Sequence, residues 1–477
     1  MGIKYKKAVF TTKELAALLG TESPLDSEIT CIVTDSRESE SGALFFALKG
    51  ERVDGHDFIP QAISRGAAAV IAERIPETLE QEERARVIVV PDSLAALGKA
   101  ARAFKQRIHP KTIAVTGSVG KTTTKEFIYA VASARFATHK TMGNYNSELG
   151  MPLSVLDMPE NAQVCVLEMG MSSLGEISRM THIAEPNIAV ITNIGNSHIE
   201  NLGSRENICR AKLEIVEGVP ENGWVILNAD EPMLFAQKGK LAQNILFVSL
   251  QNPLADYRAL NIRQYEDSTE FDLVAGKRVV TNVKIPTIGR HNVYDATYAF
   301  AVGILLGMSD DEIKRGLMSF RNTGMRQNIY EYGGITISED CYNAGPESMK
   351  AAVEVLARMS DKTPCRTVAV LGDMRELGEY SKQLHMEIGT LVASAHISNL
   401  VTFGREAENI ALGAINHAFK PDNISINTNI ENPAATAGTV YDLLRRGDAV
   451  LFKASRAVRL ERVIEELKKL IDSKPLL

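Results

Sequence analysis

The stretch KTIAVTGSVGKTTTKEF, residues 111–127, constrains the fold of this chain more than any other segment. An apolar run ends at Gly117 and a helix-forming run begins near Gly120, so the pattern predicts a strand, a tight glycine turn and a helix. Strands connected in this way form parallel sheets, with their functional residues at the carboxyl ends. Free backbone N–H groups and the positive end of the helix dipole then face the turn, which predicts a phosphate site.

The turn is shorter than the common phosphate loop G-x-x-x-x-G-K-[ST], because Val115 stands where that pattern has its first glycine. Its second half is complete. Lys121 is placed to reach the terminal phosphates, and Thr122 is placed to put its hydroxyl on a magnesium ion. The alternative is an ordinary strand-to-helix turn with a chance lysine, which the strand and helix context disfavours.

A chain of 477 residues is too long for one hydrophobic core, and its length suggests roughly three domains. Residues 1–105 mix short strand-like runs with a turn-rich segment and end in a helical pattern. Residues 106–322 alternate apolar strands with helices, and residues 323–477 repeat this alternation as a second doubly wound module. We therefore expect an α/β protein of three domains with mostly parallel sheets.

Composition excludes several classes of function. The 53 basic and 59 acidic residues give a net charge of −6, so we expect no general attraction to nucleic acid or to an anionic membrane. The five cysteines are widely spaced and lack a C-x-x-C pattern, which favours reduced thiols in a cytosol. We find no signal peptide, and the longest apolar run, residues 296–308, is too short to span a bilayer. These features predict a cytoplasmic protein.

Three further residues could serve a phosphate site. Glu168 ends the apolar run VCVLE and offers the hard oxygen ligand that magnesium prefers. His198 follows the next apolar run, although taken alone it is better explained as a capping or packing residue. Lys212, taken alone, is a solvated lysine on an amphipathic helix. If carbon dioxide carbamylated its amine, the same side chain would instead end in a carboxylate-like metal ligand.

Many motifs in a fixed order resemble the Mur ligase family and cover nearly the whole chain. They are TGSVGKTTTKE, GNYNSELGMP, LEMG, NIGNSHIENLGSRENICRAKLEI, LNADEP, GRHNVYDA, DCYNAGPESM and LGDMRELGEYSKQLH, with DSRESESGALFFALKGERVDGHDF near the N-terminus. Members of this family use a short loop T-G-x-x-G-K-[ST], so the resemblance explains the missing first glycine at Val115.

The resemblance implies an N-terminal domain that binds a UDP-sugar, a central ATPase domain and a C-terminal Rossmann-like domain. Within the family the match is closest to the ligases that join D-alanyl-D-alanine to UDP-N-acetylmuramoyl-tripeptide. It therefore implies an ATP-dependent ligase of peptidoglycan synthesis that works through an acyl phosphate. The expected partners are these two small substrates and ATP, and the expected state is a monomer.

The resemblance also implies roles for individual residues. It places the ATP phosphates on the loop residues Gly117, Ser118, Val119, Gly120, Lys121, Thr122 and Thr123, and the rest of the nucleotide on Asn292, Arg326 and Asp340. It implies two Mg²⁺ ions held by Thr122, Glu168, His198 and carbamylated Lys212, of which His198 and Lys212 act in catalysis with Lys121. It assigns substrate contacts to Asp35, Ser36, Arg37, Asn144 and Asn146.

Several positions depart from the family pattern, and they leave fine substrate contacts open. They are Val119, Asn196, Gly345, Ala454 and Ala457. The sequence also leaves open whether the tripeptide ends in lysine or diaminopimelate.

Three other functions compete with this interpretation. The related ligase that adds the third amino acid carries D-N-P-R in its diaminopimelate-adding members, whereas this chain has only ENPA at residues 431–434. A nucleotide switch with a phosphate loop would need neither Lys212 nor a third domain that contacts nucleotide. A non-catalytic paralogue should have lost metal-site residues, and none is missing here.

Overall fold

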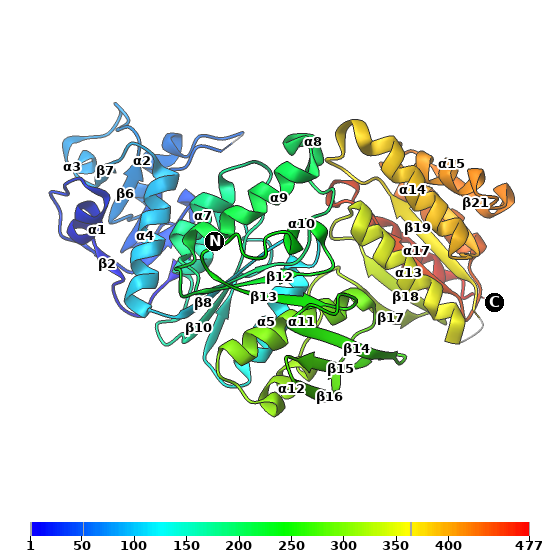
Figure 1. Ribbon diagram of the computed structural model, residues 1–477. Helices are drawn as coiled ribbons and strands as arrows, with labels where there is room; N and C mark the ends of the chain where they lie inside the picture. The colour runs from blue at the N-terminus through cyan, green and yellow to red at the C-terminus, as the bar shows by residue number, and fades with distance from the viewer. Residues whose placement is uncertain (1, 51, 363–364, 477) are drawn as a thin grey trace.

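The computed structural model describes residues 2–50, 52–362 and 365–476, and within these residues three β-sheets of five or more strands follow one another along the chain (Figure 1). The N-terminal and C-terminal sheets lie on either side of the central one in this view. Most strand pairs are parallel, and helices cover the sheets, which confirms the expected α/β architecture. The domain borders after residues 105 and 322 stay predictions.

The N-terminal sheet has the order β1-β4-β5-β6-β7, and only β1 is antiparallel to its neighbour. Its strands are β1 (Ile3–Lys4), β4 (Cys31–Val33), β5 (Ala43–Phe46), β6 (Ala69–Ala72) and β7 (Val87–Val89), beside the pair β2 (Phe10–Thr11) and β3 (Glu28–Ile29). The helices are α1 (Thr12–Leu19), α2 (Ile59–Ser64), α3 (Gln81–Arg84) and α4 (Ser93–Ile108). Helix α4 begins where the Asp92 carboxylate accepts hydrogen bonds from the N–H groups of Leu94 and Ala95, a typical N-cap.

The central sheet has nine strands in the order β16-β15-β14-β13-β12-β11-β8-β10-β9. Its parallel part consists of β8 (Lys111–Thr116), β9 (Thr138–Lys140), β10 (Val164–Glu168), β11 (Ile188–Ile191), β12 (Trp224–Asn228) and β13 (Asn244–Ser249). Because β8 lies between β10 and β11, residues that follow these three strands meet at one edge of the sheet.

Helices cover both faces of the central sheet. One core cluster contains residues of α5 (Lys121–Ser133), α11 (Arg290–Leu305) and α12 (Asp310–Met318). The other contains residues of α6 (Gly150–Leu156), α7 (Glu176–Ala184) and α9 (Arg205–Leu213), and short helices α8 (Ile199–Leu202) and α10 (Pro232–Phe235) lie near it. Helix α11 contains the apolar run 296–308 up to Leu305, and the burial of that helix agrees with its expected role as a buried helix. None of the described helices is long and apolar enough to cross a bilayer.

An antiparallel extension widens the central sheet and was not predicted from the sequence. Strands β14 (Tyr257–Gln264), β15 (Thr269–Ala275) and β16 (Arg278–Ile285) pair antiparallel with each other, and β14 continues β13 in parallel. Buried and partly exposed residues alternate along β15, which is the period-two pattern of a sheet with one covered face.

The C-terminal sheet has the order β17-β18-β22-β19-β20-β21, with only β17 antiparallel. Its strands are β17 (Asn328–Tyr332), β18 (Ile335–Asp340), β19 (Thr367–Gly372), β20 (Asn399–Phe403), β21 (Ile424–Asn427) and β22 (Ala449–Lys453). Helices α13 (Pro346–Lys362), α14 (Ser381–Ser394) and α15 (Glu408–Asn416) contribute to one core, and α16 (Pro433–Leu443) and α17 (Glu461–Ser473) to the other. This is the doubly wound module expected after residue 322.

Candidate functional site

The glycine turn between β8 and α5 has the backbone that the sequence predicted. Gly120 has φ of +86° and caps α5, which begins at Lys121. Gly117 has φ of +149°, and a Cβ added there would lie 1.9 Å from the Thr192 hydroxyl. Only glycine combines these backbone angles with this close approach, so both glycines are required to form the turn.

The end of β11 holds this turn in place. The Val119 N–H donates to Asn193 Oδ1 over 2.9 Å, and the Val119 carbonyl accepts from the Thr192 hydroxyl over 2.6 Å. The Gly195 N–H donates to the Ser118 hydroxyl over 2.8 Å. The loop contacts at position 119 therefore use the backbone alone, which explains how the chain keeps a formed loop with a valine at this position.

A cavity of about 720 Å³ opens beside the turn and is lined by residues of both the central and the C-terminal sheets. It brings together most of the predicted nucleotide and metal residues, namely Ser118, Val119, Gly120, Lys121, Thr122, Thr123, Glu168, His198, Asn292, Arg326 and Asp340. Gly117 and Lys212 do not line it; Gly117 is a buried residue of the turn, and Lys212 is buried in α9.

Lys121 carries its amine over the turn. Its Nζ donates to the Gly117 carbonyl over 2.8 Å and to the Ser118 carbonyl over 3.4 Å. Burial lowers the pKa of Lys121, while the carboxylate of Glu168 acts to raise it. The amine is thus held at the mouth of the loop, where an anionic ligand would replace the two carbonyls as its partner.

Glu168 ends β10 as a buried carboxylate. Its Oε1 accepts a hydrogen bond from Asn146 Nδ2 over 2.8 Å, whereas no described residue donates a hydrogen bond to its buried Oε2. Burial raises the pKa of Glu168, but the cations Lys125, Lys121 and Arg326 and the Asn146 hydrogen bond outweigh it, so the pKa lies below its usual value. Glu168 is therefore an ionised carboxylate with one oxygen available to a metal ion.

Lys125 is a site residue that the sequence analysis missed. It is buried in α5, its Nζ donates to the Thr141 carbonyl over 2.9 Å and lies 3.5 Å from Glu168 Oε2. Its position four residues after Lys121 places both lysines on one side of the helix, which was the available clue. That spacing was not enough to select Lys125, because a lysine within a polar helical segment is ordinarily solvated.

His198 joins the central and C-terminal parts of the cavity. It adopts a left-handed conformation before α8, and its Nδ1 forms an ion-pair contact with Oε2 of Glu376, a residue that follows β19. The hydrogen bond from His198 is the main reason that the pKa of Glu376 lies below its usual value. Glu376 was not predicted, because nothing in the sequence shows that these two loops meet.

Lys212 is 1% exposed, so its interpretation as a solvated surface lysine is wrong. No hydrogen bond or ion pair links its amine to any residue in the described part of the chain. Burial lowers the pKa of Lys212 far below its usual value, and the nearby cation of Lys121 lowers it further. The structure therefore holds a buried amine whose protonated form is disfavoured by its surroundings.

Contacts between the central and C-terminal parts involve two of the unusual positions. The backbone N–H of Asn196 and its Nδ2 both donate to Glu347 Oε1, over 2.9 and 3.2 Å. A carboxylate at position 196 would repel Glu347, so asparagine suits this contact. A Cβ added at Gly345 would lie 3.1 Å from the Ser197 hydroxyl, so the small residue permits the close approach.

The buried Ala454 packs against a glycine in the C-terminal sheet. A Cβ added at Gly372 would lie 2.7 Å from the Ala454 methyl group. The methyl group at position 454 therefore fills the space that a residue larger than glycine at position 372 would need.

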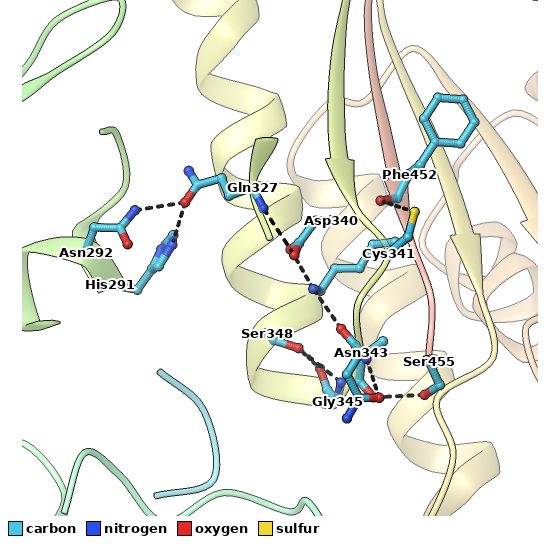
Figure 2. Close-up of polar contacts among 12 residues, drawn as sticks. His291, Asn292, Gln327, Asp340, Cys341, Asn343, Gly345, Ser348, Phe452 and Ser455 are labelled. Carbon is cyan, nitrogen blue, oxygen red and sulfur yellow. Dashed lines mark hydrogen bonds and ion pairs between the residues drawn. The ribbon is translucent and has the colours of Figure 1, made fainter. Parts of the chain in front are cut away.

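Asn292 and Asp340, two of the three nucleotide residues predicted in the second half of the chain, belong to one polar network (Figure 2). Asn292, in the first turn of α11, donates to Gln327 Oε1 over 2.8 Å, and the Gln327 N–H donates to Asp340 Oδ1 over 3.3 Å. Lys453 donates to Asp340 Oδ2 over 2.5 Å. Arg326 lies over the ring of Tyr342, 4.0 Å from its centroid. Gln327 and Lys453 were not predicted.

The predicted substrate residues are spread over two places. Asn146 lines the cavity through its contact with Glu168, whereas Asn144 is exposed and does not line it. Asp35, Ser36 and Arg37 lie after β4 in the N-terminal part, where the Asp35 carboxylate accepts hydrogen bonds from the Arg37 guanidinium. Their roles stay predictions.

The metal residues do not form a ready-made cage. Among the described residues, no group of three or more His, Cys, Asp and Glu side chains is arranged to hold a metal ion. Any magnesium ion here would need other oxygen donors, such as the Thr122 hydroxyl and the phosphates of a nucleotide.

Asp295, beneath the turn, leads to a pH prediction. It accepts a hydrogen bond from the Thr124 hydroxyl over 2.6 Å, and burial raises its pKa to about 7. Because this folded-state pKa exceeds the unfolded value, Asp295 lowers stability progressively as pH rises from about 4 to about 7. Asp295→Asn should therefore have a higher free energy of unfolding than the unchanged protein at pH 8, by about 1.4 kcal/mol for each pKa unit of separation, and hence a higher unfolding temperature. Near pH 4 the two proteins should be equally stable.

Calorimetric melting curves of both proteins across this pH range provide the measurement. Taking the difference at each pH cancels the contributions of all other groups. A difference that does not change between pH 4 and pH 8 would contradict the assignment of a neutral Asp295.

Comparison with known proteins agrees with this organisation. Residues 115–303 match the Mur ligase middle domain, residues 325–456 the glutamate ligase domain of Mur ligases, and residues 28–105 the Mur ligase family catalytic domain. UDP-N-acetylmuramoyl-tripeptide–D-alanyl-D-alanine ligase of Bacillus subtilis (strain 168) is 40% identical over 463 residues, which cover 96% of this chain and 98% of that protein.

Two solved structures resemble the whole chain. MurF from Acinetobacter baumannii superposes with a TM-score of 0.86 at 30% identity, covering 96% of this chain and 99% of that one. MurF ligase from Thermotoga maritima, in complex with ADP, superposes with a TM-score of 0.83 at 34% identity, covering 93% and 98%.

Proposed function

Because the chain belongs to the Mur ligase family, we propose that it is an ATP-dependent ligase that joins D-alanyl-D-alanine to UDP-N-acetylmuramoyl-tripeptide. The products are the UDP-linked pentapeptide of peptidoglycan synthesis, ADP and phosphate. One observation carries the proposal: a phosphate loop, a buried carboxylate and residues of the C-terminal sheet line the same cavity. The matching relatives act on these substrates by name, and the alternative of adding the third amino acid gains no support from them.

The reaction has two steps. A carboxylate oxygen of the tripeptide attacks the γ-phosphorus of ATP, so an acyl phosphate forms and ADP leaves. The amine of D-alanyl-D-alanine then attacks the acyl carbon, and the tetrahedral intermediate expels phosphate as the amide bond forms. Lys121, held over the turn, would stabilise the charge that builds up on the transferring phosphoryl group.

The loop residues 117–123 bind the phosphates in this proposal. The N-terminus of α5 supplies free N–H groups and the positive end of its dipole. Asn292 and Arg326 hold the nucleoside side, and Asp340 approaches the nucleotide from the C-terminal sheet. These residues come from the central and the C-terminal parts of the chain. A bound nucleotide therefore stabilises the conformation in which these two parts are in contact.

The proposed site holds two Mg²⁺ ions, with nucleotide phosphates completing the oxygen donors that the side chains lack. Thr122 and Glu168 would hold one, and Glu168 Oε2 supports this role because it accepts no hydrogen bond from the described residues and has the Lys125 amine only at 3.5 Å. His198 and Lys212, as its carbamate, would hold the other. When bound, the ions would offset the negative charges of the triphosphate and the tripeptide carboxylate.

The buried amine of Lys212, whose protonated form is disfavoured by burial, suits carbamylation. Its nitrogen lone pair can add to carbon dioxide, forming a C–N bond and releasing one proton. A protonated amine has no lone pair for this reaction, so the lowered pKa favours the modification. The resulting carbamate is an oxygen donor of the kind that magnesium prefers.

Substrate binding extends to the N-terminal part in this proposal, where Asp35, Ser36 and Arg37 contact the UDP-sugar while Asn144 and Asn146 contact the acceptor. The five free cysteines and the use of ATP support a cytoplasmic location. We expect the protein to act as a monomer.

The proposed activity predicts phosphate release that depends on the amine. Incubation with ATP, magnesium and UDP-N-acetylmuramoyl-tripeptide should release phosphate at a steady rate only after D-alanyl-D-alanine is added. Parallel reactions with UDP-N-acetylmuramoyl-dipeptide and either lysine or diaminopimelate test the related ligase. Absence of release that depends on D-alanyl-D-alanine would contradict the proposal.

A further inference from the structure

Gln327 connects the nucleotide residues of the central sheet to those of the C-terminal sheet. It lies between Arg326 and β17 and has φ of +45°, an uncommon conformation for a residue other than glycine. Its side chain reaches back to the start of α11, while its N–H donates to Asp340. No motif in the sequence pointed to this residue.

One backbone carbonyl fixes the orientation of two side-chain amides. The Ile288 carbonyl can only accept, and Asn292 Nδ2 lies 2.6 Å from it while Gln327 Nε2 lies 2.9 Å from it. Both nitrogen atoms must therefore face Ile288. It follows that the oxygen of Gln327 is the atom that faces Asn292, and Figure 2 shows this contact.

These contacts use both N–H groups of Asn292. One donates to the Ile288 carbonyl and the other to Gln327 Oε1 over 2.8 Å, with the Thr287 hydroxyl a more distant acceptor at 3.3 Å. The Asn292 oxygen accepts no hydrogen bond from the described residues, and Figure 2 shows it turned away from Gln327. Since Asn292 lines the cavity, it offers a bound ligand an acceptor and no donor.

His291 completes the contacts of Gln327 Oε1. Its Nε2 lies 3.1 Å from this oxygen, which only accepts, so Nε2 carries the proton. Burial lowers the pKa of His291, which keeps the ring neutral at pH 7. Gln327 Oε1 therefore accepts two hydrogen bonds, and its position is fixed from two sides.

We propose that Gln327 is a positioning residue that makes the nucleotide site selective for a 6-aminopurine, because it occupies the N–H of Asn292 that could otherwise donate to the oxygen of a 6-oxopurine. Adenine presents an N–H donor at position 6, whereas hypoxanthine and guanine present an oxygen there. An Asn292 that offers only an acceptor forms a hydrogen bond with the N–H of adenine and repels the oxygen of hypoxanthine or guanine. The inference rests on the proposed use of ATP.

Two substitutions of similar size separate this role from a general structural one. Gln327→Met and Gln327→Glu both remove the hydrogen bond to the Ile288 carbonyl. Only Gln327→Glu keeps an oxygen that can accept from Asn292. The added charge of the glutamate weakens the binding of all nucleotides alike, so it does not affect the ratio between two of them.

The measurement is the dissociation constant of ATP and of ITP, taken separately by calorimetry with magnesium and the full chain. We expect the unchanged protein to bind ATP at least about tenfold more tightly than ITP, because the Asn292 oxygen and the oxygen at position 6 of ITP would be two acceptors facing each other at a buried site. Gln327→Met should lower this preference about tenfold, since a freed N–H of Asn292 can then turn to the oxygen of ITP. Gln327→Glu should keep the preference within about threefold.

Three results would overturn the inference. They are an equal loss of preference in both variants, an unchanged preference in Gln327→Met, and no preference in the unchanged protein. If Gln327→Met does not fold, Gln327→Ala takes its place with the same expectation. Binding of neither nucleotide by the unchanged protein would instead contradict the proposed function itself.

Discussion

Replacing Lys212 by alanine is expected to lower the rate of amine-dependent phosphate release by at least about a hundredfold, because the site loses the group that carries the proposed carbamate. The lysine makes no hydrogen bond or ion pair with other described residues, so this loss cannot come from a broken network. Formate or acetate added to the variant should restore part of the rate, since a small carboxylate can occupy the space of the missing group. Steady-state assays with and without these anions provide the measurement.

Two further variants make the Lys212 experiment specific. Arg210→Ala removes an exposed cation from the same helix and should leave the rate unchanged. Lys212→Met keeps an apolar chain of similar length, so it should abolish activity while leaving the unfolding temperature of the metal-free protein equal or higher, because burying an amine is costly. Full activity of Lys212→Ala would rule out the carbamate.

Replacing Lys121 by alanine is expected to reduce the rate of acyl phosphate formation about 10³-fold. The amine is the cation that the structure holds over the turn, and the backbone N–H groups cannot supply its charge. Nucleotide binding should fall much less, because those N–H groups and the helix dipole remain. Rapid-quench measurement of ADP in a single turnover, beside calorimetric binding of ADP, separates the two effects.

Lys277→Ala is the matched control for Lys121, since it removes an exposed lysine from the β15–β16 turn of the same part of the chain. It should change neither rate nor binding. A Lys121→Ala protein that keeps more than about a tenth of the rate would contradict the role given to this amine.

Local patterns in the sequence were sufficient to predict the turn at residues 117–120. Gly117 and Gly120 stand where the backbone needs positive φ, and the residues that follow form α5 as expected. Glu168 could also be placed, because a residue that ends a parallel strand lies at the edge where the neighbouring strands end. These predictions depend only on short-range pattern and on the geometry of parallel sheets.

Long-range contacts could not be predicted in this way. Glu376 meets His198, and Gln327 meets Asn292, only because two separate sheets lie against one cavity. The β14–β16 extension was missed since its strands depend on pairing with each other and with β13. Side-chain partners that are distant in sequence leave no periodic pattern to detect.

Lys212 shows most clearly what the sequence and the tertiary structure each determined about this protein. Its sequence determined a helix with a lysine, together with the family and the parallel α/β fold around it. Only the tertiary structure decided that this lysine is buried with no hydrogen-bond or ion-pair partner among the described residues, so that the pKa of its amine lies far below the usual value. The physical reason is that a pKa depends on desolvation and on nearby charges, and both are set by how distant segments pack together.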